Sequence, residues 1–273
     1  MQLLTTTLTQ KIQCEVVEKL QCEDFQRATQ AITEILAEMY ANIPANKRIS
    51  YGVVYTIKQL TDTLFPLLKT EGFSIPGIAP KLIKQSVDWR CQGVVLGLLT
   101  NYGLDHFNEV LPYFEEMAAS KQWELREITQ MFFKRLIKKN PEAAQQFLLT
   151  LTQSADPNIR RFVAETLRPV QENRWFYRQP EYSLSVLRHL LTESAAYPRT
   201  AVGNNLSDLA RRLPELVYEI VRELVASGNR NSYWIAYRAC RNLVKSDPLK
   251  VMDLLQVDEY QYKQRVYRRS DYT

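Results

Sequence analysis

Two acidic residues lie among arginines at spacings that place them on one face of a helix. Glu165 lies four residues after Arg161 and three before Arg168, and Asp208 lies four before Arg212. A carboxylate on a DNA-binding surface repels phosphate, so it is expected to have a use there. It can stabilise the positive charge that develops on a deoxyribose ring as a glycosidic bond breaks, or it can orient water. The alternative is that Glu165 simply pairs with Arg161 or Arg168.

The basic residues gather in the second half of the chain. The chain has 273 residues and a net charge of +5; residues 1–150 hold 16 basic and 16 acidic residues, whereas residues 151–273 hold 19 basic and 14 acidic. Sixteen of those 19 are arginine, whose planar fork suits phosphate. This bias indicates a polyanionic partner, with a chance excess on a solvated surface as the alternative.

Repeated helical pairs are expected to position these side chains. Pro141, Pro180, Pro214 and Pro248 each open an apolar helical stretch, at spacings of 39, 34 and 34 residues. Proline at the first helical position, followed by glutamate in three of the four cases, is a helix-start signal. An amphipathic helix precedes each one, beginning near Trp123, Pro157, Pro198 and Trp234. The period predicts an all-α fold, an α-solenoid of HEAT-like helical hairpins.

A helical wheel gives each first helix an apolar face and a polar face. Stacking the repeats aligns the polar faces into one concave, basic surface with few carboxylates and exposed aromatic rings such as Trp234. We divide the chain into residues 1–119, a helical region that continues the solenoid, and residues 120–273, the repeats that carry this surface. In the first region, helices are expected over Phe25–Ala41, Val53–Leu68, Ala79–Leu99 and Asp105–Ala119, with a loop from Glu71 to Pro80.

Other features exclude several classes of protein. Four cysteines and two histidines are widely scattered, so we expect reduced thiols, no metal site and no hydrolase triad. Scarce glycine argues against a phosphate-cradling loop, and we expect no cofactor. There is no apolar run long enough to span a membrane and no signal-peptide pattern, which favours a cytoplasmic protein. Because no coiled-coil heptads indicate an oligomer, we expect a monomer. The aromatic and basic segment 260–269 is expected to be a frayed terminus, with contact to DNA as the alternative.

Three segments resemble motifs of the AlkC-type DNA alkylation repair glycosylases. Residues 156–169 (DPNIRRFVAETLRP) resemble the motif DPNxxVRRLxSEGxRP. Residues 197–209 (YPRTAVGNNLSDL) resemble YVRxSVxNNLNDI, and residues 234–245 (WIAYRACRNLVK) resemble WxxxHAxRTLVK. The three occur in the family's order and cover roughly residues 120 to 257.

The resemblance implies a repair enzyme that cleaves the N-glycosidic bond of alkylated bases, such as N3-methyladenine, in double-stranded DNA. Glu165 matches the motif glutamate and is assigned charge stabilisation or water positioning; Asp208 matches the acid of the second motif and is assigned a supporting electrostatic role. Localisation would be cytoplasmic, with association to the nucleoid on DNA. The residues expected to contact DNA are Arg161, Arg168, Arg199, Asn205, Trp234, Arg238 and Arg241.

Further candidates follow from the same resemblance. The family carries a tryptophan close behind its first motif, for which Trp175 is the candidate, and an acid one repeat earlier, for which Glu124 and Glu127 beside Trp123 stay open. A second hypothesis is a catalytically inactive HEAT-like scaffold that binds DNA or protein through the same face. The enzyme hypothesis expects Glu165 and Asp208 to be exposed on the basic surface, and the scaffold hypothesis expects them in ion pairs.

Overall fold

The computed structural model describes residues 3–48 and 52–273, which form two compact units, Met1–Asn140 and Pro141–Thr273. The sequence-based division placed the boundary between residues 119 and 120, whereas the compact units meet after Asn140. The first repeat helix, α9 (Trp123–Lys139), packs against the helices that precede it and therefore belongs to the first unit.

In the first unit, two layers of helices pack against each other. One layer contains α3 (Phe25–Ala41), α5 (Val53–Thr70), α7 (Trp89–Gly103) and α9, each in contact with the next; α6 (Ile75–Gln85) and α8 (Phe107–Ala118) cover it. A helical segment made of α1 (Thr6–Lys11), the π-helix η1 (Ile12–Val17) and α2 (Glu18–Gln21) packs on α3, which a short 3-10 turn, η2 (Ala45–Lys47), follows.

Two expectations for this unit are wrong. The helix expected over Ala79–Leu99 is broken, because Ser86 is extended and the Asp88 carboxylate caps α7 by accepting the Arg90 N–H at 2.9 Å. The segment from Glu71 to Pro80 is not all loop, since Ser74 caps α6 at residue 75. Pro76 and Pro80 therefore lie in the first two turns of that helix. Capping residues, which act locally, decided both boundaries.

The second unit repeats the two-layer arrangement. One layer holds α11 (Pro157–Thr166), α13 (Ala196–Leu209) and α15 (Arg230–Ala239), and the other holds α10 (Pro141–Leu151), α12 (Pro180–Leu187), α14 (Pro214–Ala226) and α16 (Pro248–Leu255). Short 3-10 turns, η3 (Gln171–Tyr177), η4 (Arg188–Leu190) and η5 (Leu243–Lys245), join some of them. The predicted α-solenoid of HEAT-like hairpins is confirmed.

The segment expected to be a frayed terminus is a packed β-hairpin. Strand β1 (Glu259–Tyr262) pairs antiparallel with β2 (Arg265–Arg268), and a last 3-10 turn, η6 (Arg269–Asp271), follows. Tyr260 is completely buried, its ring lies 4.4 Å from that of Tyr237, and its hydroxyl donates to the Tyr237 carbonyl at 2.9 Å. The buried tyrosine fixes the hairpin against α15.

Arginines at the starts of three first helices close the loops that precede them. The Arg126 Nη1 donates to the carbonyl of Ser120 at 2.7 Å, and the Arg160 Nη1 donates to that of Ser154 at 2.7 Å. Arg199 likewise reaches the Ser194 carbonyl, at 3.3 Å. In the second unit the same side chains reach the following repeat: Arg160 pairs with Glu193, and Arg199 donates to Asn231 at 2.6 Å.

Gly203 allows α13 and α15 to approach closely. A Cβ at this position would lie 2.8 Å from the Cβ and 3.0 Å from the Cγ of Arg238. We therefore expect Gly203→Val to lower the free energy of unfolding by about 1–3 kcal/mol in urea denaturation. Ala226→Val, on the exposed end of α14, controls for the helix propensity of valine. An equal loss in both variants would show that the close approach does not constrain Gly203.

Candidate nucleic-acid interface

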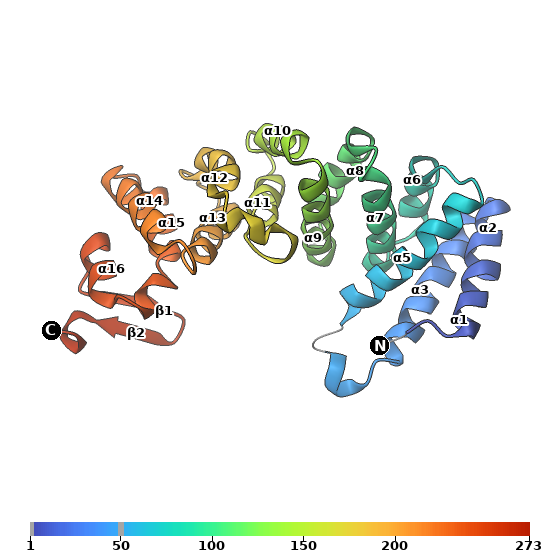
Figure 1. The fold of residues 1–273 in the computed structure, drawn as a ribbon, viewed down its shortest axis with the longest axis horizontal. Coiled ribbons are helices and arrows are strands. Elements are labelled where there is room, and N and C mark those ends of the chain that lie inside the picture. Colours follow the sequence, from blue (N-terminus) through green and yellow to red (C-terminus); the bar gives the residue numbers. More distant parts are fainter. Residues whose placement is uncertain (1–2, 49–51) are drawn as a thin grey trace. The chain divides into compact units, whose positions relative to one another are not determined.

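The first-helix layer of the second unit gathers the predicted site residues. Side chains three or four positions apart lie on one face of a helix, and α11, α13 and α15 lie side by side (Figure 1). Contacts between side chains bring the predicted residues of three repeats together. We call this set the arginine face. It comprises Arg161, Arg168, Arg199, Arg211, Arg238 and Arg241 with the carboxylates Glu165 and Asp208.

Arg168 bridges the two carboxylates. Its Nη1 donates to Glu165 Oε2 at 3.0 Å, while its Nε and Nη2 donate to Asp208 Oδ2 at 2.8 and 2.5 Å. Burial by itself would lower the pKa of Arg168, but the charges of Glu165 and Asp208 outweigh it and raise that pKa. Arg168 therefore stays protonated and joins α11 to α13.

Both carboxylates have further arginine partners. Asp208 Oδ1 lies 3.3 Å from Arg241 Nη2 and 3.5 Å from Arg211 Nη2, and Glu165 Oε1 lies 3.9 Å from Arg161 Nη2. The structure thus brings the two acids together in one ion-pair network. Such a network is strongly coupled, because removal of one charge leaves the others buried without a partner.

The exposure that the enzyme hypothesis expects of these carboxylates is not found, and both lie in ion pairs, as the scaffold hypothesis expects. Glu165 is 5% exposed and Asp208 is 1% exposed, because arginine side chains cover them. The Arg168 side chain above them is 28% exposed and the Arg211 side chain is 60% exposed. The predicted DNA contact Arg161 is itself buried, at 8% exposure, and the Arg241 side chain is 14% exposed. The accessible guanidinium groups of the network are therefore chiefly those of Arg168 and Arg211.

Amide and hydroxyl groups hold the remaining arginines. Asn204 Oδ1 accepts from Arg238 Nε at 2.9 Å and from Arg241 Nη1 at 2.8 Å, and Ser207 Oγ accepts from Arg241 Nε at 2.9 Å. Asn204 and Ser207 come from α13, so these bonds fix Arg238 of α15, and Arg241 just after it, on the neighbouring helix. Neutral acceptors orient both guanidinium groups and leave the charge of Arg238 uncompensated.

Arginines of one repeat also lie over aromatic rings of the next. The guanidinium carbon of Arg161 lies 4.4 Å from the centre of the Tyr197 ring, and that of Arg199 lies 4.8 Å from the Trp234 ring. Tyr197 is 38% exposed and Trp234 is 37% exposed. Sequence reasoning placed Trp234 here but missed Tyr197, although it opens the second motif.

The network carries an excess of positive charge. Six arginines face two carboxylates, which leaves four uncompensated charges. Within the described part of the chain, no ion pair joins Arg199 or Arg238 to a carboxylate; Asn231, Asn204 and the Trp234 ring hold them instead. A rigid surface of this kind is suited to bind phosphate.

Two predicted contacts pack against neighbouring side chains or backbone instead. Asn205 is completely buried, and its Nδ2 donates to the Ala164 carbonyl at 2.9 Å, so it links α13 to α11 and presents no atom to DNA. Trp175 is half-buried in η3, where its ring lies 4.5 Å from that of Phe176 and 4.8 Å from that of Tyr182. The helical wheel could not separate Asn205 from the surface, since its burial comes from the neighbouring repeat.

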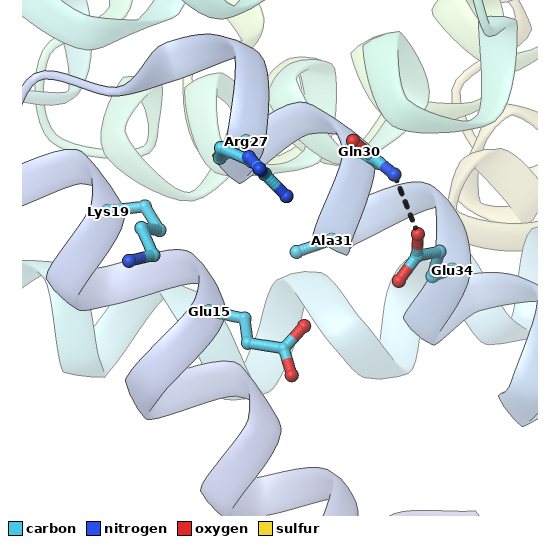
Figure 2. Close-up of a pocket in the computed structure, with 6 residues that line it drawn as sticks. All are labelled: Glu15, Lys19, Arg27, Gln30, Ala31 and Glu34. Carbon is cyan, nitrogen blue, oxygen red and sulfur yellow. Dashed lines mark hydrogen bonds between the residues drawn. The ribbon is translucent and has the colours of Figure 1, made fainter.

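The remaining candidates lie on α9, in the first unit. Trp123 is 60% exposed, and Glu124 and Glu127 are half-buried. Glu127 Oε2 accepts from Gln130 Nε2 at 3.4 Å, and Gln130 in turn accepts from the buried Lys134. A pocket of about 150 Å³ lies elsewhere in this unit, and its lining is drawn in Figure 2. Two acidic and two basic side chains in that lining balance, so the pocket lacks the cation excess of the arginine face. Its lining is Glu15, Lys19, Arg27, Gln30, Ala31 and Glu34.

The described residues form neither a metal-binding cluster nor a membrane-spanning helix. Among residues 3–48 and 52–273, no group of three or more histidine, cysteine, aspartate or glutamate side chains is arranged to hold a metal ion. In that same part of the chain, no helix combines the length and apolar character needed to cross a bilayer.

Solved structures with this fold include DNA glycosylases. The structure of the Pseudomonas fluorescens alkylpurine DNA glycosylase AlkC, bound to DNA containing an abasic site analog, matches 86% of this chain and 69% of its own length with a TM-score of 0.64 and 18% identity. AlkD2 from Streptococcus mutans matches 77% of this chain and 98% of its own, with a TM-score of 0.55 and 18% identity. The chain has the fold of AlkC and AlkD2. The AlkC-like resemblance of its motifs is thus confirmed at the level of the fold.

The solved structure of smu.31 from Streptococcus mutans UA159 matches 68% of this chain and 98% of its own length, with a TM-score of 0.52 and 19% identity. A 159-residue segment is 25% identical to YhaZ of Bacillus subtilis strain 168, described as an uncharacterized protein; it covers 56% of this chain and 42% of YhaZ. The chain therefore matches less than half the length of that relative. No family model matches the chain.

Proposed function

We propose that this protein is a DNA repair glycosylase that binds double-stranded DNA through the arginine face and hydrolyses the N-glycosidic bond of alkylated bases such as N3-methyladenine. The observation that carries the proposal is the excess of positive charge on the arginine face, where six arginines accompany two carboxylates. This face lies on a fold that is shared with DNA-bound AlkC. Arginines that contact phosphates release counterions and supply salt-dependent affinity, while exposed rings such as Trp234 pack on sugars.

The chemistry needs little beyond charge stabilisation. An alkylated purine such as N3-methyladenine is already cationic, so when the C1′–N bond breaks, its electron pair goes to the base, which leaves as a neutral molecule. Positive charge then develops on the deoxyribose ring, and a nearby carboxylate stabilises it. The oxygen of a water molecule adds to C1′, and its proton passes to the carboxylate or to solvent. Glu165 is the proposed carboxylate, and Asp208 supports it.

The position of Arg168 determines whether the two carboxylates can reach a bound deoxyribose. In the free protein its guanidinium covers Glu165 and Asp208, with only 5% and 1% of the two acids exposed. A DNA phosphate competes for the same guanidinium, since phosphate accepts bidentate hydrogen bonds from arginine as a carboxylate does. We propose that binding draws Arg168 toward the phosphate and uncovers Glu165 at the sugar.

Release of methylated bases from alkylated duplex DNA by the purified protein tests the proposal. We expect release by the native protein and at least a tenfold loss in Glu165→Gln, with duplex binding retained. Glu181→Gln, an exposed acid on α12, is the matched control and is expected to release bases at the native rate. Undiminished release in Glu165→Gln would contradict the catalytic assignment and leave the enzyme without a known carboxylate.

A second candidate is a non-catalytic HEAT-like scaffold that binds DNA through the same face. The saturation of Glu165 and Asp208 with arginines favours it, because a purely structural network has this form. Duplex binding without base release, in the native protein and with several alkylated substrates, would select the scaffold. Absence of duplex binding would reject both candidates.

A further inference from the structure

A pocket lies between α15 and the C-terminal hairpin, next to the arginine face. It has a volume of about 330 Å³, within the range of about 300–1,000 Å³ typical of small-ligand sites. Trp234, Tyr237 and Arg238 line it from α15, and residues 260–263 line it from the hairpin. There is no carboxylate in this lining. Trp234 and Arg238 are shared with the arginine face, so the two sites are continuous.

The walls of this pocket are held rigidly. The Tyr237 hydroxyl accepts from the backbone N–H of Gln261 at 2.7 Å and donates to the Gln261 carbonyl at 3.1 Å. Lys263, at the hairpin turn, has a φ of 57°, a left-handed conformation that turns the chain between the two strands. With the buried Tyr260 beneath it, the hairpin presents Tyr262 and Lys263 at a fixed position.

Three cations surround the Tyr262 ring. The guanidinium carbons of Arg238 and Arg241 each lie 5.9 Å from its centre, and Lys263 Nζ lies 5.8 Å from it. Burial would raise the pKa of Tyr262, but a hydrogen bond from Arg241 and the charges of Arg241, Arg238 and Lys263 outweigh it and lower that pKa. The pocket therefore combines aromatic faces with a positive potential.

We propose that this pocket binds an unpaired nucleobase of a DNA strand, stacked on Tyr262, while the adjoining phosphates contact Arg238 and Lys263. Every nucleobase has a flat π face that stacks on aromatic rings, and its phosphates need cations beside the ring. An acidic peptide would use the cations but leave the rings without a planar partner. The proposal deepens the proposed function, because it assigns a distorted duplex as the preferred form of DNA.

Two duplexes of one sequence test this, one fully paired and one with a single bulged 2-aminopurine, a fluorescent adenine analogue. We expect the full-length protein to bind the bulged duplex about tenfold more tightly by fluorescence anisotropy, with a change in 2-aminopurine emission on stacking. Tyr262→Leu is expected to bring the ratio of the two affinities to about one, whereas Tyr262→Phe keeps the ring and keeps the preference. Tyr272→Leu, 43% exposed at the C-terminus, is the control.

The outcomes separate the pocket from the proposed function. Equal affinity of the native protein for both duplexes, or a preference that survives in Tyr262→Leu, would overturn the pocket proposal. Binding of a short single strand that depends on Tyr262, without any binding of the paired duplex, would support the pocket and reject the duplex-binding function. Tighter binding of a poly-glutamate peptide than of a single strand would assign the pocket to an acidic peptide and overturn the nucleobase proposal.

Discussion

Asp208→Ala is expected to lower the free energy of unfolding by about 3–5 kcal/mol, because it removes a buried charge and leaves its partners uncompensated. Asp208 accepts from Arg168 at 2.5 and 2.8 Å and lies 3.3 Å from Arg241 and 3.5 Å from Arg211. Loss of this one carboxylate leaves Arg211 and Arg241 without a carboxylate partner, while Arg168 keeps only Glu165. Urea denaturation followed by circular dichroism measures the change.

The matched control is an ion pair at the surface. Asp253 lies 2.6 Å from Arg269, but its side chain is 65% exposed, so Asp253→Ala is expected to cost no more than about 1 kcal/mol. If Asp208→Ala costs as little as Asp253→Ala, the arginine network does not stabilise the unit. The arginines would then have to be held by their bonds to Asn204 and Ser207 alone.

Duplex binding is expected to weaken about a hundredfold when the salt concentration rises from 50 to 200 mM. The reason is the release of condensed counterions, with a slope of log affinity against log salt of about −0.9 for each phosphate contact, applied to about four arginine contacts. Arg168→Gln and Arg211→Gln should each make the slope shallower by about one contact, since these side chains are the accessible partners of Asp208.

A control arginine comes from the other helix layer. Arg222 is exposed on α14, so Arg222→Gln lowers the net charge equally without changing the arginine face. Its salt slope is expected to equal that of the native protein. Slopes that stay the same in all three variants would move the DNA-binding surface away from the arginine face.

The repeated prolines and the helical period predicted most of the fold. Local signals set the helix starts: Pro141, Pro180, Pro214 and Pro248 each open a helix, as expected. The hairpin was missed because four-residue strands carry too little alternation to be distinguished from a loop. Its stability comes from the burial of Tyr260 against Tyr237, a contact between elements.

The helical wheel predicted which side chains share a face but not their burial. Glu165 lies near the end of α11 and Arg168 two residues beyond that end, so their pairing follows from spacing alone, but Asp208 reaches Arg168 across 40 residues. The burial of both carboxylates depends on the contact between Arg168 and Asp208, which the residue pattern of a single helix cannot predict. The same limit applies to Asn205, whose partner is the backbone of the preceding first helix.

The arginines that close the loops before the first helices also couple the stability of each repeat to that of the next. Arg160 holds the Ser154 carbonyl in its own repeat and Glu193 at the start of the next, and Arg199 does the same with Ser194 and Asn231. Each guanidinium is therefore shared by two adjacent modules, which is the nearest-neighbour coupling of a one-dimensional Ising chain. Adjacent first helices are therefore expected to open together, which amide hydrogen exchange at α11, α13 and α15 measures.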